Sequence, residues 1–205
     1  ALDYLLEMAP DSPQASRWKS LREGIERNVR AHLWDVKRQK FIPHIYPEKS
    51  PIPEGFDELA IHYHGGTAIA IEAGLLSKDE IRTVNAQMLE NVRLSGMPSI
   101  GLTLYPVYPD GFFHGGMSKA YLYQNGGDWT WFGGRMIQQL VVNGMVEEAY
   151  AEIHPMIERV IQNDGFYEWY GKGGVPSGSG NFKGSAGVLS KAIELLRDWA
   201  EKNKS

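Results

Sequence analysis

The 205-residue sequence contains no cysteine. Disulfide bonds, thiolate zinc sites and cysteine nucleophiles are therefore excluded together. It also lacks any apolar run near the roughly 18 residues needed to cross a bilayer, so we expect no membrane partner. The formal net charge is −4 and no basic stripe stands out. Nucleic acid is therefore not expected as a partner either.

Several motifs that would hold a cofactor or a metal are also missing. No glycine-rich loop ends in Lys-Ser or Lys-Thr to cradle phosphate, and Ser185 lacks the surroundings of a hydrolase nucleophile. His62 and His64 form an H-x-H pair near Asp57 and Glu58. Such a pair can bind a metal but more often packs and hydrogen-bonds. We therefore expect neither a metal nor a cofactor.

Aromatic residues and glycine are plentiful. The chain has six Trp, ten Tyr, seven Phe and 23 Gly. Aromatic faces beside flexible loops suit a site that stacks on a flat apolar ligand surface. A large core connected by many turns would give the same composition, so composition alone leaves both interpretations open.

Apolar residues recur at helical spacing along most of the chain. Asp11 or Ser12 is the expected cap of the first long helix, and Ser77 with Glu80 forms a capping box. Pro155 predicts a kink or a late start in its helix. The stretch 40–46 is expected to be extended. The expected helices are 12–33, 58–73, 77–92, 130–142, 146–162 and 184–202. The first carries an apolar stripe, and Asn143-Gly144 ends the fourth. In the last helix the side chains expected to point inward are Val188, Ile193, Leu196 and Trp199.

Two parts of this pattern resemble each other. The segments 68–92 and 132–160 each read as a buried helix, a glycine turn and an amphipathic helix, which is a repeated αα-hairpin. One hairpin cannot bury its own apolar face, so such hairpins stack or close into a ring. We therefore predict an all-α single domain over residues 1–205. Further helices, from another part of the protein or a second chain, are expected to complete the ring.

Two loops, 95–127 and 164–182, are too long to be ordinary connections. The first leads into a motif in which Gln124 and Asn125 offer hydrogen bonds to hydroxyls, and Trp129 and Trp131 offer stacking faces. Asp128 stands at the expected helix start, where it either caps the helix or binds a sugar hydroxyl.

The second loop carries Glu168 between Tyr167 and Trp169. Desolvation by such neighbours would raise the pKa of a carboxyl group, as acid–base catalysis requires. The alternative is an exposed loop glutamate flanked by packed aromatic rings. Spacing alone favours the exposed glutamate.

Both loops resemble those of the six-hairpin glycosidase superfamily, the (α/α)6 barrels of glucoamylases, trehalases, neutral invertases and glycogen-debranching-type enzymes. The segment 123–129, Tyr-Gln-Asn-Gly-Gly-Asp-Trp, resembles the family's Tyr-x-Asn-Gly-x-x-Trp loop. The segment 166–170, Phe-Tyr-Glu-Trp-Tyr, followed by glycines and 181–186, resembles its late catalytic loop. Gly184 stands where relatives often have Trp. The resemblance spans about 12–199 and implies the C-terminal half of a barrel.

The resemblance implies a glycoside hydrolase with an inverting mechanism. Glu168 would be the general base that activates water, with the two carboxyl groups roughly 6.5–9.5 Å apart. In the family the acid comes from an earlier helix pair, and Asp128 is the one candidate acid in this chain. The alternatives are a non-catalytic carbohydrate-binding or scaffold module, and a protein-binding helical repeat in which the two loops lie apart.

Sugar recognition combines aromatic faces for the ring with polar groups for its hydroxyls. Arg135 has the alternative role of a structural ion-pair partner. The expected carbohydrate-binding residues are Tyr123, Gln124, Asn125, Trp129, Trp131, Arg135, Tyr167 and Trp169.

Overall fold

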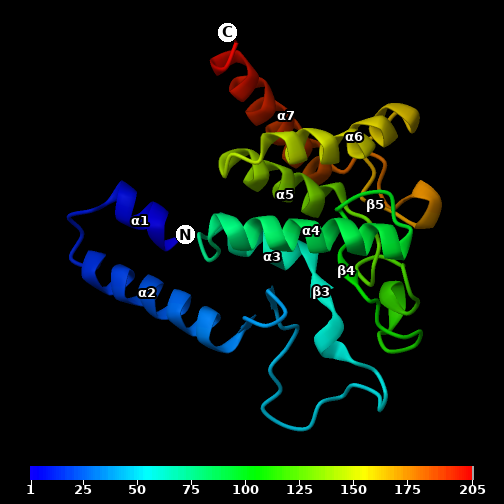
Figure 1. The fold of residues 1–205 in the computed structure, drawn as a ribbon, viewed down its shortest axis with the longest axis horizontal. Coiled ribbons are helices and arrows are strands. Elements are labelled where there is room, and N and C mark those ends of the chain that lie inside the picture. Colours follow the sequence, from blue (N-terminus) through cyan, green and yellow to red (C-terminus); the bar gives the residue numbers. More distant parts are fainter. Residues whose placement is uncertain (205) are drawn as a thin grey trace.

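The computed structural model describes residues 1–204 and is mostly helical (Figure 1). The α-helices of this part are α1 (Leu2–Met8), α2 (Ala15–His32), α3 (His64–Glu72), α4 (Lys78–Ser95), α5 (Thr130–Val142), α6 (Val146–Gln162) and α7 (Lys183–Lys202). Short 3-10 helices are η1 (Glu58–Ala60), η2 (Gly115–Met117) and η3 (Lys172–Gly174). In residues 1–204, no helix combines the length and apolarity that a membrane span needs.

Small antiparallel strand pairs join the loops between these helices. The strands are β1 (Trp34–Asp35) with β2 (Lys40–Phe41), β3 (His62–Tyr63) with β4 (Leu104–Tyr105), and β5 (Trp169–Tyr170) with β6 (Pro176–Ser177). The prediction of a helical protein is therefore confirmed in its coarse form. The strands were not predicted, apart from an extended segment at 40–46, of which β2 is a part.

The helices that were predicted best are those with clear local sequence signals, namely apolar periodicity, caps and stops. The structure confirms the expected ranges of α5 and α6, and α7 begins one residue before its expected start. The capping box of α4 is present: the Ser77 hydroxyl accepts from the Glu80 amide, and the Glu80 carboxylate accepts from the Ser77 amide. α6 begins at Val146 and continues through Pro155, so the late start was wrong.

The expected helix at 58–73 was wrong in its first part. η1 and β3 occupy residues 58–63, and α3 begins only at His64. The physical reason is non-local: His62 and Tyr63 pair with Tyr105 and Leu104, which holds that backbone extended. α1 was not predicted, because seven residues are too few to establish a helical period.

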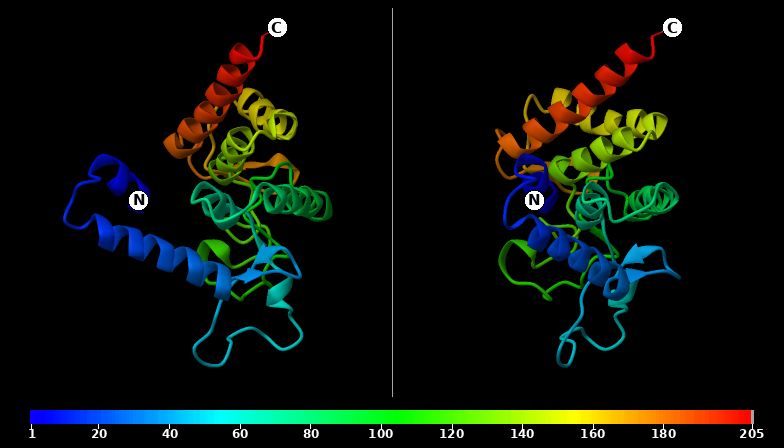
Figure 2. Two further views of the ribbon diagram at one scale, coloured as in Figure 1. Left: turned by 60° about the vertical axis from the view of Figure 1, so that its left-hand side comes forward. Right: turned by 90° about the vertical axis from the view of Figure 1, so that its left-hand side faces the viewer.

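α2 has the predicted length but not the predicted burial. None of its residues is buried, and the side chains of its apolar stripe are largely open, with Leu21 46% and Ile25 55% exposed. α2 packs mainly against α1 and β1, and the two helices form an arm beside the rest of the molecule (Figures 1 and 2). Its N-cap is Gln14 without a side-chain cap bond, so neither Asp11 nor Ser12 caps it.

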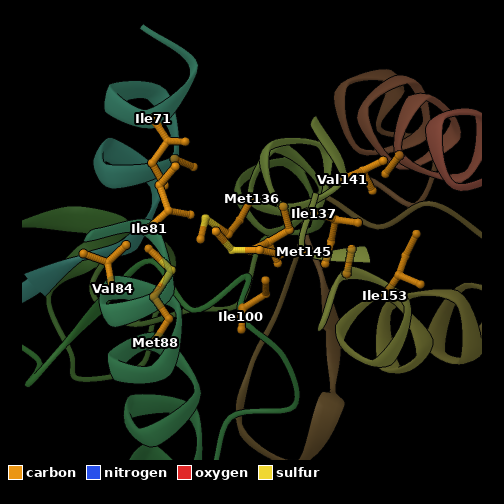
Figure 3. Packing of buried hydrophobic residues seen from close by; sticks show 14 of the residues in the cluster. Ile71, Ile81, Val84, Met88, Ile100, Met136, Ile137, Val141, Met145 and Ile153 are labelled. Carbon is orange, nitrogen blue, oxygen red and sulfur yellow. The ribbon is translucent and has the colours of Figure 1, made fainter. Parts of the chain in front are cut away.

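The main core lies between α3 and α7, with α5 at its centre. α5 contacts α3, α6 and α7, and Figure 3 shows Met136 and Ile137 of α5 between side chains of the neighbouring helices. Gly134 permits the close approach of α7, because a Cβ there would lie 2.8 Å from Val188 Cγ1. In α7 the inward residues are Leu189 and Ala192.

The inward face predicted for α7 was partly wrong. Ile193 and Trp199 were expected to point inward, but each is 44% exposed. The reason is that the far side of α7 has no neighbouring helix in the described residues, as the views of Figure 2 show. Leu196 does pack against the core, half-buried.

A ladder of backbone hydrogen bonds connects the long loops. Beyond the β3–β4 pair, the Thr103 amide donates to the Gly127 carbonyl at 2.9 Å. Asp128 and Tyr170 then exchange two bonds, of 2.9 and 2.8 Å, and Tyr170 belongs to the β5–β6 pair. This ladder fixes the 123–129 motif against the Glu168 loop.

Candidate functional site

The two predicted motifs meet at Tyr123 and Glu168. The Tyr123 hydroxyl donates to Glu168 Oε1 at 3.4 Å. The Tyr123 ring packs edge-on against Trp129, with centroids 4.9 Å apart, and against Trp169 at 6.2 Å. These contacts contradict the alternative in which the two loops lie apart.

A tight turn in the first motif brings Tyr123 to this place. The Gly127 amide donates to the Tyr123 carbonyl at 2.9 Å. A Cβ on Gly127 would collide with that carbonyl oxygen and lie 3.0 Å from Trp169 Cε3. Only glycine therefore lets the backbone approach both neighbours this closely.

Glu168 is held mainly by its backbone. Its amide donates to the Ser179 carbonyl at 2.9 Å, whereas the Ser179 amide reaches Glu168 Oε2 only at 3.4 Å. The residue is half-buried. Both side-chain contacts are at the long limit of a hydrogen bond, so both carboxylate oxygens retain capacity to accept from water or a ligand.

Asp128 has a different environment. It is fully buried, and its Oδ1 lies 2.7 Å from Arg159 Nη1. The Ser99 hydroxyl lies 2.9 Å from Oδ1 and 2.7 Å from Oδ2. The N-cap of α5 is Trp129, so Asp128 does not cap that helix. Both of its oxygens are occupied, which favours a structural role over proton donation or hydroxyl binding.

The Arg159 guanidinium, which pairs with Asp128, also contacts two other residues. Its Nη2 donates to Thr130 Oγ1 at 2.7 Å, and its Cζ lies 4.1 Å from the centroid of the Tyr170 ring. Arg159 is 5% exposed. The buried Asp128–Arg159 pair thus connects α6 with the start of α5 and with β5.

Two predicted binding residues of the first motif stabilise the loop itself. Asn125 is fully buried, with Oδ1 accepting from the Tyr108 amide at 2.9 Å and Nδ2 donating to the Tyr108 and Lys119 carbonyls. Trp129 is 5% exposed, and its Nε1 donates to the Tyr123 carbonyl at 3.2 Å. Neither side chain is open to a ligand. Gln124 is exposed.

The accessible aromatic residues come from the second motif. Tyr167 and Trp169 are half-buried on either side of Glu168, as is Tyr123 opposite. Lys172 Nζ lies 3.7 Å from the centroid of the Tyr121 ring. The partly exposed side chains at Glu168 are therefore one carboxylate and three aromatic rings, and the Lys172–Tyr121 pair is a separate contact of the same two loops.

Arg135 and Trp131 form a separate group on α5. Arg135 Nη1 lies 3.0 Å from Glu72 Oε2, and its guanidinium stacks over Trp131 at 4.5 Å. The ion-pair alternative for Arg135 is confirmed. A Cβ on Gly184 would lie 3.0 Å from Trp131 Cδ1 and 2.9 Å from Phe182 Cε1, so these two rings fill the space beside the glycine.

Sequence reasoning missed a second organised carboxylate, Glu58. Its Oε1 accepts from the hydroxyls of Tyr108 at 2.7 Å and Tyr46 at 2.8 Å, and lies 2.8 Å from His44 Nδ1. Although burial opposes it, the hydrogen bonds from Tyr108, His44 and Tyr46 lower the pKa of Glu58. Tyr108 lies 50 positions from Glu58, so no local sequence pattern predicts the cluster.

His62 and His64 do not converge with carboxylates. Burial lowers the pKa of His64 to about 3 and that of His62 to about 4. His64 Nε2 lies 3.1 Å from Asn91 Nδ2. Within residues 1–204, no three or more His, Asp or Glu side chains are placed to hold a metal ion.

The chemistry of these residues has to be interpreted from their own geometry. No protein-family model and no curated protein matches this chain.

Proposed function

We propose that the chain is the catalytic domain, or part of it, of a glycoside hydrolase in which Glu168 acts as the general base. The observation that carries the proposal is the contact between Tyr123 and Glu168 at 3.4 Å. It joins a half-buried carboxylate to aromatic residues of both loops, and sugar sites pair acceptors with apolar ring faces.

In the proposed reaction, Glu168 removes a proton from a water molecule as that water attacks the anomeric carbon. An inverting enzyme leaves room for the water by holding its two carboxyl groups roughly 6.5–9.5 Å apart. The Tyr123 hydroxyl positions Glu168 by donating to Oε1. The other oxygen, Oε2, which lies near the Ser179 amide, takes the proton.

The acid of this reaction needs a carboxyl group that carries a proton. Asp128 is ion-paired to Arg159, and hydrogen bonds lower the pKa of Glu58. The buried Asp128 has both oxygens occupied and presents neither to a leaving group, while the lowered pKa of Glu58 favours its ionised form. We therefore infer that the acid comes from a further part of the barrel.

We infer that the hairpins belong to an (α/α)6 toroid. Supporting features are the hairpins α3–α4 and α5–α6 and the central position of α5 between α3 and α7. Exposed apolar side chains on α2 and α7, such as Ile25, Ile193 and Trp199, offer surfaces for further helices. An N-terminal half or a second chain is the proposed source of those helices.

One observation favours a second candidate, a non-catalytic carbohydrate-binding module. The one carboxylate within the first motif, Asp128, is fully buried in an ion pair. A module that kept the aromatic loops without a proton donor would bind a sugar and not cleave it.

The test compares Glu168→Gln with a matched control, Glu158→Gln on the exposed face of α6. Both variants remove one carboxylate, but only the first changes the site. The native chain and both variants are assayed for hydrolysis of maltose, trehalose, sucrose and maltotriose, and of α-D-glucosyl fluoride, whose fluoride leaves without a proton from an acid, so that Glu168 is tested even where the acid lies outside this chain. NMR of the fresh product reports the anomer. Binding is measured by titration under the same conditions.

The proposal expects inverted product, a rate loss of about 100-fold or more in Glu168→Gln, and no change in Glu158→Gln. Sugar binding by the native chain without hydrolysis of the fluoride would favour the module. Unchanged hydrolysis in Glu168→Gln would refute the base, and neither binding nor turnover of any sugar would overturn the carbohydrate proposal.

A further inference from the structure

A cavity outside the Glu168 site lies between α4, α6 and the segment 98–100. Its volume is about 330 Å³, at the lower end of the range of small-molecule sites. Leu89 and Val92 of α4 form one wall, Ala151 and Pro155 of α6 form the other, and Ile100 lies between them. Figure 3 shows Ile100 in this position, between the two helices.

One buried carboxylate lines this apolar cavity. Glu152 is 7% exposed, and its Oε1 accepts from Asn85 Nδ2 at 2.6 Å. Its Oε2 is buried, as is Asn85 Oδ1, and neither has a hydrogen-bond partner in the part of the chain that the structure describes. Two acceptors thus lie unpaired in one place, where each unsatisfied polar group is costly.

The charges around Glu152 are all negative. Glu148, one turn earlier on the same face of α6, also lines the cavity, and the lining contains no Lys, Arg or His. The buried arginine of α6, Arg159, is already paired with Asp128 at 2.7 Å. The cavity therefore offers an apolar wall and two carboxylates, and no cation among its lining residues to balance them.

We propose that this cavity binds a small organic amine, with its ammonium group at Glu152 and its apolar body against Leu89, Val92 and Pro155. An ammonium group supplies the donors that Oε2 lacks, and charge-assisted hydrogen bonds in a desolvated place are the strong ones. The exposed carboxylate of Glu148 at the rim of the cavity adds electrostatic attraction for the ammonium group. The inference does not depend on the sugar proposal, because it uses none of the residues around Glu168.

Protonation of Glu152 competes with the amine. Burial raises the pKa of Glu152 to about 7, and the nearby charge of Glu148 adds to the increase. The lining residues from α4 and from 98–100 carry no charge. Since the amine needs the ionised carboxylate, its affinity rises as the pH increases through about 7.

The probes are phenethylamine and, as the neutral match, 2-phenylethanol. Binding to the intact chain is followed by NMR, with shifts expected at Leu89, Val92 and Ala151, and by calorimetry at pH 5.5 and 8. The variants are Glu152→Gln and the control Glu147→Gln, which removes a neighbouring exposed carboxylate outside the lining. Thermal unfolding checks that each variant is folded.

The expected result is phenethylamine binding that weakens about 10- to 100-fold in Glu152→Gln and is unchanged in Glu147→Gln. A second variant, Leu89→Trp, fills the cavity from its rim while Glu152 stays intact, and is expected to abolish binding. Equal binding of the alcohol, unchanged affinity in Glu152→Gln, or amine affinity weaker than about 10 mM would each overturn the proposal. Failure here leaves the outcome of the sugar assays unaffected.

Discussion

Asp128 and Glu168 lie in the same layer of loops, joined through the Asp128–Tyr170 backbone pair, yet their surroundings differ. Asp128 is fully buried and bonded to Ser99 and Arg159 within 2.9 Å. Glu168 is half-buried, with two side-chain contacts of 3.4 Å. The partners of each carboxylate thus distinguish a structural residue from an available one. We expect substitution of Asp128 to lower stability and substitution of Glu168 to leave stability almost unchanged.

The largest expected effect is on the buried pair. Asp128→Asn leaves the Arg159 charge buried without its partner, so we expect a loss of about 3–5 kcal/mol of unfolding free energy, measured by urea denaturation. The control is Asp79→Asn, which breaks an Asp–Arg pair on the surface of α4 and should change little. Equal effects of the two would contradict the structural role of Asp128.

Glu152 is buried like Asp128, but no cation pairs with it in residues 1–204. Its folded pKa of about 7 lies above the ordinary 4.5. The folded state therefore holds the proton more tightly, and its contribution to stability is present below about pH 4.5 and lost as pH rises through 7. The difference between the native chain and Glu152→Gln should change by roughly 3 kcal/mol over this range.

The native chain and Glu152→Gln have to be compared at each pH because His62 and His64 also make the unfolding free energy depend on pH. Their pKa values are lowered, so their effect on stability has the opposite sign to that of Glu152. Their contributions are present above about pH 6.5 and lost as pH falls. They cancel when the two proteins are compared at each pH by urea denaturation. A pH-independent difference would contradict the raised pKa of Glu152.

A substitution in the turn that carries Tyr123 tests whether the 123–129 motif and the Glu168 loop depend on each other for stability. Gly127→Ala forces a Cβ against the Tyr123 carbonyl and Trp169, so we expect a loss of about 1–3 kcal/mol and a change in Trp fluorescence. In Gly116→Ala the added Cβ meets nothing within 4 Å, which makes it the matched control. No difference between the two would indicate that the motifs are not locked together.

The smallest effect on stability is expected from Tyr123→Phe. The hydroxyl bond to Glu168 is 3.4 Å long, so its loss should cost less than about 1 kcal/mol in thermal or urea unfolding. The control is Tyr150→Phe, on a residue that is 61% exposed. A cost in Tyr123→Phe as large as that of Asp128→Asn would mean that Glu168 is also a structural residue.

The sequence predicted well whatever depends on neighbouring residues. α5 and α6 follow from apolar periodicity and the Asn143-Gly144 stop, and the Ser77–Glu80 box marks the start of α4. The meeting of the two loops was also expected, through the family resemblance rather than from spacing, but the contact of Tyr123 with Glu168 was not.

What the sequence missed depends on distant partners. β3 is extended because it pairs with β4 about forty residues later, and Asp128 is buried because Arg159 reaches it from another helix. The Glu58 cluster needs Tyr108, 50 positions away. None of these partners leaves a local pattern, so burial and pairing at these sites require the fold.

The two bonds that Asp128 and Tyr170 exchange tie together loops that are far apart in the chain. Neither loop can open locally without breaking bonds of the other. Their amide protons should therefore exchange with solvent at a common rate, since cooperative units open together. We therefore expect the backbone that carries Glu168 to open together with the 123–129 motif, as one unit.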